Sequence, residues 1–243
     1  MFYRPLTLTG LEGNDDMSMA PRRIALLGVA LVAACAAAPA AFGLPRAVIN
    51  QFTGARVIRA EVIVLAADGS AQDTRIDRGV IVLLTPATVT LRESNGDIVP
   101  VAIGAGTQVQ GNRVSSPGQL RRGMRVVVYQ VAGQPAQIVQ GESINAQFFG
   151  PRMVRAEVLL LGAGGAVQDY RLDRGVVVSA ASGTLTVRES NGDTVPLPVD
   201  PAAQVQGGGR RVTAATLRRG TRVVVYRSAN APAELVQVEG IGP

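Results

Sequence analysis

Residues 88–101 read TVTLRESNGDIVPV, and the same pattern returns at residues 184–197 as TLTVRESNGDTVPL. In both places Asn-Gly separates two runs in which apolar and polar residues alternate. Asn-Gly tolerates the positive φ angles of a type I′ turn, and such alternation is typical of half-buried strands. Each stretch is therefore predicted to be a tight β-hairpin.

The similarity extends well beyond these hairpins. Residues 59–111 align without gaps on residues 155–207, and 29 of the 53 positions are identical. After a shift of one residue, LRRGMRVVVY from Leu120 matches LRRGTRVVVY from Leu217. This self-similarity indicates a tandem duplication. We predict two modules, at residues 44–142 and 143–243.

Within the first module, turn signals separate short runs of period two from one another and from a continuous apolar run at residues 125–130. They predict strands at 56–66, 72–77, 80–84, 88–92, 97–103, 125–130 and 136–140, with a helical turn before the sixth. Gly79 is expected to permit a bend. A module this small must curl its sheet to bury one face, so the predicted fold is all-β, with two tandem OB-like β-barrels. A β-sandwich is the alternative.

The order TVTLRESNGDIVPV, TQVQG, LRRGMRVVVY and PAQIVQ resembles an exported bacterial family of unknown function whose members repeat a small β-barrel. The resemblance covers about residues 79–140 and 175–238. It implies the fold and export, and it implies no activity.

Residues 17–43 have the layout of a secretory signal peptide, with Arg22-Arg23 before an apolar run and small residues at the end. Residues 1–16 are interpreted as an upstream extension. Three outcomes stay open: cleavage near Ala40, lipidation of Cys35 within the lipobox-like VAAC, or an uncleaved anchor. In each case the protein is expected to be exported to the periplasm, the cell envelope or the exterior.

Missing residue types restrict the chemistry. The chain has no His, and Cys35 is its one cysteine. Catalytic arrangements that need His, His-based metal sites and internal disulfides are therefore excluded. We expect no cofactor, no metal and no enzymatic activity.

The chain carries 24 basic residues, all of them arginine, and a net charge of +6. The excess of arginine has two alternative explanations, coding bias and selection for an anionic partner. The candidate anion-binding residues are two repeated clusters: Arg121, Arg122 and Arg125, and Arg218, Arg219 and Arg222. A guanidinium suits phosphate or carboxylate, although solvated strand entries with local ion pairs are the plainer interpretation. Nucleic acid is the less favoured polymer, because Tyr129 and Tyr226 are the only aromatic residues expected near the clusters.

Two sets of carboxylates are candidate sites. The first comprises Asp73 and Asp77, with their copies Asp169 and Asp173, which are expected to face outward in a cross-strand ion-pair ladder rather than to bind calcium. The second comprises Glu93 and Asp97, with Glu189 and Asp193, which flank the Asn-Gly turns. Paired carboxylates hydrolyse glycosides, but a hairpin tip outside any cleft disfavours that role.

Taken together, these features predict a non-enzymatic, exported envelope or secreted module that contacts an unknown protein or envelope polymer. Binding of an anionic polymer through the arginines is the alternative. A carboxylate-dependent hydrolase is the least favoured reading.

Overall fold

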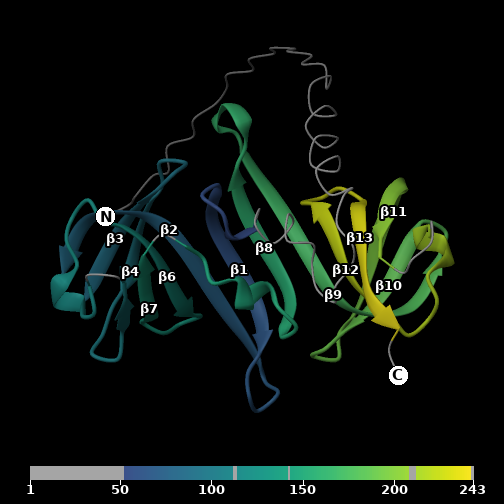
Figure 1. The fold of residues 1–243 in the computed structure, drawn as a ribbon, viewed down its shortest axis with the longest axis horizontal. Coiled ribbons are helices and arrows are strands. Elements are labelled where there is room, and N and C mark those ends of the chain that lie inside the picture. Colours follow the sequence, from purple (N-terminus) through teal and green to yellow (C-terminus); the bar gives the residue numbers. More distant parts are fainter. Residues whose placement is uncertain (1–51, 112–113, 142, 208–211, 242–243) are drawn as a thin grey trace, which may run out of the picture. The chain divides into compact units, whose positions relative to one another are not determined.

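The computed structural model describes residues 52–111, 114–141, 143–207 and 212–241 (Figure 1). The first repeat contains β1 (Val57–Leu65), β2 (Ala71–Thr85), β3 (Thr88–Glu93), β4 (Ile98–Ala102), β5 (Gln108–Gln110), the 3-10 helix η1 (Pro117–Gln119), β6 (Arg125–Val131) and β7 (Ala136–Gly141). The second contains η2 (Ala146–Phe149), β8 (Met153–Leu161), η3 (Ala163–Gly165), β9 (Val167–Ala181), β10 (Thr184–Glu189), β11 (Thr194–Gln206), η4 (Ala214–Thr216), β12 (Thr221–Ser228) and β13 (Ala233–Ile241). The predicted all-β class is confirmed.

The structure merges two predicted strands into one. Strand β2 is continuous, and its first half pairs with β1 while its second half pairs with β3. The exchange of partners occurs at Gly79. A Cβ atom at this position would lie 2.6 Å from the carbonyl oxygen of Arg92. A glycine is therefore needed for β3 to approach β2 here, and Gly175 meets the same close approach in the second repeat.

Strands β1 and β8 pair antiparallel and join the two repeats into one mixed sheet of thirteen strands. At the centre of this pairing Glu61 stands opposite Glu157, which is its own counterpart in the second repeat. Arg59 stands opposite Leu159, and Ile63 stands opposite Arg155. Equivalent residues thus exchange partners about a local two-fold axis, as in the interface of a symmetric dimer.

Beyond this junction, the pairings in the second repeat run β9–β10–β11–β13–β12 and return to β9. Only β11 and β13 are parallel within this order. The first repeat follows the same order, except that β4 and β5 replace the continuous β11. Each repeat therefore positions its strands in nearly the same way.

Each repeat also has its own hydrophobic core. In the first it is formed mainly by Ile81, Val89, Leu91, Val101, Val126, Val128 and Val139. In the second it is formed mainly by Val177, Leu185, Val187, Leu197, Val223, Val225 and Val236. In β6 and β12 the core residues alternate with residues that are also buried, Val127 and Val224, so these two strands are covered on both faces.

Candidate anion-binding surface

Two of the predicted arginines stand on a tight turn before β6. Gly123 adopts a φ of +91°, and its N–H donates to the carbonyl of Ile81 at 2.8 Å. This turn leaves Arg121 and Arg122 exposed, while Leu120 is buried beneath them. Gly220 repeats the geometry in the second repeat, with a φ of +90° and a 2.9 Å bond to Val177.

A further arginine joins each cluster through sheet pairing. Arg125 on β6 stands opposite Val80 on β2, and Val80 stands opposite Arg92 on β3. Directly opposed residues project from the same face of a sheet, so Arg92 and Arg125 share one outward face. Arg222, Val176 and Arg188 repeat this row. Arg92 and Arg188 were not identified from the sequence, although both lie in the repeated RESNGD block.

We call these groups the arginine surfaces: Arg92, Arg121, Arg122 and Arg125 in the first repeat, and Arg188, Arg218, Arg219 and Arg222 in the second. All eight side chains are exposed. Within the described part of the chain, none of the eight has a carboxylate within ion-pairing distance. Arg121 instead donates to the carbonyls of Gly118 and Leu120, at 2.6 and 2.8 Å. The eight positive charges are therefore not neutralised by the fold.

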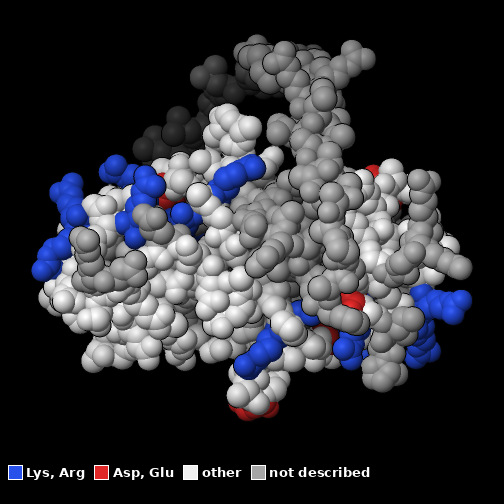
Figure 2. Space-filling view, viewed as in Figure 1, with Lys and Arg blue, Asp and Glu red and all other residues white. Residues whose placement is uncertain are grey.

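The fold keeps the two surfaces apart. Strands β2, β1, β8 and β9 lie between β6 and β12 in the order of the sheet. The antiparallel pairings also make β6 and β12 run in opposite directions. Arg125 and Arg222 both lie at the start of their strands, so they lie toward opposite edges of the sheet. On the face drawn in Figure 2 the basic side chains form separate groups. An extended ligand is needed to contact both surfaces at once.

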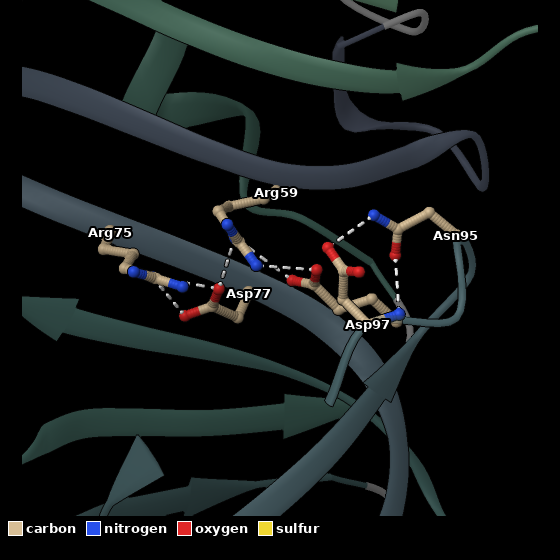
Figure 3. A network of polar contacts seen from close by, with 6 residues as sticks. Arg59, Arg75, Asp77, Asn95 and Asp97 are labelled. Atoms are coloured by element: carbon tan, nitrogen blue, oxygen red, sulfur yellow. Dashed lines mark hydrogen bonds and ion pairs between the residues drawn. The ribbon is translucent and has the colours of Figure 1, made fainter. Parts of the chain in front are cut away.

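Other arginines are neutralised inside the fold, and Figure 3 shows one such network. Arg59 donates from Nε to Asp77 at 3.0 Å and from Nη2 to Glu93 at 2.7 Å. Arg75 donates from Nε to the other oxygen of Asp77 at 2.9 Å. In the second repeat the ion pairs join Arg155 to Glu189 and Asp193, Arg171 to Glu157, Arg174 to Glu239, and Arg227 to Asp173.

The structure confirms cross-strand ion pairs for Asp77 and Asp173, two of the four predicted acids, and corrects the expected exposure of both. Asp77 is fully buried rather than outward-facing, because Arg59 and Arg75 flank it and β3 approaches β2 at Gly79. Asp173 is likewise buried. Asp73 is exposed, as predicted, and Asp169 is partly exposed. No group of three potential metal-ligating side chains occurs within the described residues.

The acids beside the Asn-Gly turn also differ from expectation. Glu93 is buried, not exposed at a hairpin tip, whereas Asp97 is exposed and accepts from Asn95 Nδ2 at 2.8 Å. Burial raises the pKa of Glu93 to about 7, although the charge of Arg59 opposes the shift. Glu189 is buried in the same way, and burial raises its pKa against the effect of Arg155. Glu93 and Glu189 each form an ion pair with an arginine. Asp97 and Asp193 accept hydrogen bonds from the asparagines of the Asn-Gly turns.

The two repeated tyrosines are structural. Tyr129 is buried, and its hydroxyl accepts from Gln140 Nε2 and from the N–H of Asn145, both at 2.8 Å. Burial raises the pKa of Tyr129 to about 12. Tyr226 is also buried. Neither ring is presented to a ligand beside the arginine surfaces.

The predicted lipidation residue Cys35 and the whole leader lie outside the described residues. No helix within the described ranges has the length and apolar character needed to span a bilayer. In the comparisons with known proteins, no family model, no curated protein and no solved structure matches this chain.

Proposed function

We propose that this chain is a non-enzymatic, exported binding protein that holds an acidic polymer of the cell envelope through its two arginine surfaces. One observation carries the proposal. Eight exposed arginines without carboxylate partners among the described residues occupy equivalent positions in both repeats. The ion-paired arginines near the repeat junction are Arg59, Arg75, Arg155, Arg171 and Arg227, while Arg56 and Arg152 there donate to backbone carbonyls. Charge that the fold leaves unneutralised is available to a ligand.

The chemistry of the surfaces favours a polymer over a small anion. Guanidinium groups present planar forks that match carboxylate and phosphate oxygens. Exposed charges in water give weak individual contacts, which salt screens. Two separated surfaces on one chain overcome this weakness when a single long ligand engages both, because the second contact is then intramolecular.

The strand order supports the finer fold assignment, two OB-like barrels in tandem. An order that returns to its first strand, with one parallel pair, is the pattern of a closed five-stranded barrel of the OB type. A β-sandwich would instead keep two sheets without such a return. The first repeat, with β4 and β5 separate, is a more open version of the same barrel.

The leader supports an envelope location, as a freely secreted protein or as a lipoprotein anchored through Cys35. The resemblance to an exported repeat family supports the same location. Among the described residues, the arginine surfaces have no exposed aromatic ring on which a base could stack. This favours an acidic polysaccharide or teichoic-type polymer over nucleic acid as the ligand. Mass spectrometry of the mature N-terminus tests the location: a diacylated Cys35 indicates an anchored protein, and a start near Ala41 indicates a secreted one.

The test of binding is retention on a heparin column across a salt gradient. The wild-type chain is expected to be retained at low salt and released by modest salt. Replacing all eight surface arginines by Gln is expected to abolish retention, and replacing four in one repeat is expected to reduce the releasing salt concentration. Circular dichroism checks that the variants keep their β structure.

Replacement of the same eight residues by Lys is the matched control, because it preserves charge and removes the guanidinium forks. Partial retention is expected for this variant. Full retention of the Gln variant would refute the proposal. Competition with single-stranded DNA and with an acidic polysaccharide then separates the two polymer classes, and stronger competition by DNA would overturn the assignment to an envelope polymer.

A further inference from the structure

The second repeat contains an apolar pocket of about 380 Å³. Leu185 and Val199, which belong to the hydrophobic core, form part of its wall, together with Ala180, Ala203 and Ala214. The pocket lies where the turn between β9 and β10, the middle of β11 and the helix η4 meet. Its volume falls at the lower end of the range for small-ligand sites.

The first repeat provides an internal comparison, because it fills the corresponding positions with larger residues. Leu84 stands where the second repeat has Ala180, Ile103 where it has Val199, and Thr107 where it has Ala203. Leu84 and Ile103 pack in the first core. The hydroxyl of Thr107 is buried there and donates to the carbonyl of Ala136 at 2.6 Å. The fold therefore does not require the space to be empty.

Other differences between the two cores compensate each other. Val89 and Leu91 in the first repeat become Leu185 and Val187 in the second, so their volumes are exchanged. At positions 180, 199 and 203, where the pocket borders the core, the second repeat has the smaller side chain, whereas the exposed rim carries Asp200 and Pro201 in place of Gly104 and Ala105. Apolar space that a larger side chain could fill lowers stability, so a ligand that fills this space gives a reason for its presence.

Polar groups occur only at the rim of the pocket. Thr184, Thr213 and Asp200 contribute to the lining; Thr213 and Asp200 are exposed, and Thr184 is partly exposed. The carboxylate of Asp200 is held in place, since Oδ1 accepts from the N–H of Ala202 at 2.7 Å. A negative charge at the mouth favours a cationic head group and disfavours an anionic one.

We propose that this pocket binds a short aliphatic chain that carries a cationic head, with the chain against Leu185 and Val199 and the head beside Asp200. The inference is independent of the arginine surfaces, which favour ligands of the opposite charge. It assigns different roles to the two repeats, because the first has Leu84, Ile103 and Thr107 at the positions of Ala180, Val199 and Ala203.

The test is isothermal titration calorimetry of the full chain with three probes below their micelle-forming concentrations. n-Octylammonium is expected to bind saturably at one site. Octanoate, with a similar chain and the opposite charge, is expected to bind more weakly. Ethylammonium, with the same head and almost no chain, is expected to show no binding, since each buried methylene contributes about 0.8 kcal/mol, or roughly a factor of four in affinity.

The decisive variant combines Ala180→Leu, Val199→Ile and Ala203→Thr, which gives the pocket the residues that the first repeat already accommodates. It is expected to raise the dissociation constant for n-octylammonium by at least about tenfold, and to keep or raise the melting temperature. Asp200→Asn is expected to retain chain binding and to lose the preference for the cation.

Unchanged affinity in the filled variant would overturn the proposal. So would an absence of saturable binding in the wild-type chain. Melting curves without ligand distinguish a filled pocket from a damaged fold, and if the triple variant proves unstable, Ala180→Leu alone serves in its place. Loss of retention on heparin in the same filled variant is not expected, so the two proposals fail separately.

Discussion

Phe52, at the start of the first repeat, stacks on Tyr226 of the second, with ring centroids 6.1 Å apart and ring planes 14° apart. Its counterpart Phe148, at the start of the second repeat, stacks on Tyr129 of the first at 4.9 Å. Each repeat therefore places its first aromatic ring on the other. Arg56 and Arg152 also contact the opposite repeat: Arg56 donates to the carbonyl of Leu161 at 2.8 Å, and Arg152 donates to the carbonyl of Leu65 at 2.7 Å. These exchanged contacts lock the repeats together around the β1–β8 pairing.

The stacking of Phe52 on Tyr226 and of Phe148 on Tyr129 predicts that replacing Phe52 lowers the stability of the fold more than replacing Phe148. Phe52 is 2% exposed and also lies near Phe149 and Tyr170, whereas Phe148 is only half-buried. Phe52→Ala is expected to lower the free energy of unfolding by about 3–5 kcal/mol, and Phe148→Ala by less than about half of that. Urea denaturation of both variants measures the difference. Equal losses would contradict the asymmetric packing.

The close approach of β3 to β2 predicts that Gly79→Ala is costly. The added Cβ meets a backbone carbonyl, which cannot move without disturbing the pairing of both strands. The expected loss is about 2 kcal/mol or more. Gly118→Ala is the matched control, since a Cβ there meets open space, and its effect is expected to stay within about 0.5 kcal/mol. Similar melting temperatures for the two variants would argue against the contact.

The buried carboxyl of Glu93 predicts that stability falls as pH rises. Its pKa is about 7 in the folded chain and near 4.5 in the unfolded chain, so the folded state binds the proton more tightly. Its contribution to stability is complete below the unfolded pKa and is lost as pH rises through the folded pKa. Relative to Glu93→Gln, the wild-type chain is expected to lose up to about 3 kcal/mol between about pH 4.5 and 8. Parallel pH profiles for the two proteins would show that Glu93 is ionised throughout.

The hydroxyl of Thr107 predicts a stability effect specific to the first repeat. It accepts from the N–H of Gly104 at 2.9 Å and donates to the carbonyl of Ala136 at 2.6 Å. The hydroxyl thereby links the loop before β5 to the first residue of β7. Thr107→Val keeps the shape of the side chain but removes both bonds, at an expected cost of about 1–3 kcal/mol. Thr85→Val, at an exposed position, is expected to change stability by less than about 0.5 kcal/mol. Chemical denaturation of the two variants provides the comparison, and a neutral Thr107→Val would exclude the bridging role.

Local patterns predicted much of the secondary structure and part of the candidate site. Alternation along residues 88–93 and the Asn95-Gly96 turn specify a hairpin through interactions between near neighbours, and the repeated LRRG sequence specifies exposed arginines before a buried strand. Period two also identified the side chains that share a strand face. It did not indicate that Asp77 is buried on its face, because burial depends on what another part of the chain brings to cover it.

The β character of the chain, its internal self-similarity, most of its turns and the exclusion of histidine and disulfide chemistry follow from residue types and short spacings in the sequence. The three-dimensional structure was needed to show that Glu61 pairs with Glu157, that Phe52 packs on Tyr226, that Arg92 joins Arg125 on one face, and that Ala180, Val199 and Ala203 border one pocket. These relationships join residues that are far apart in the chain. They depend on which strands pair and in which register, and that choice is made by the burial of whole sheet faces rather than by any local motif.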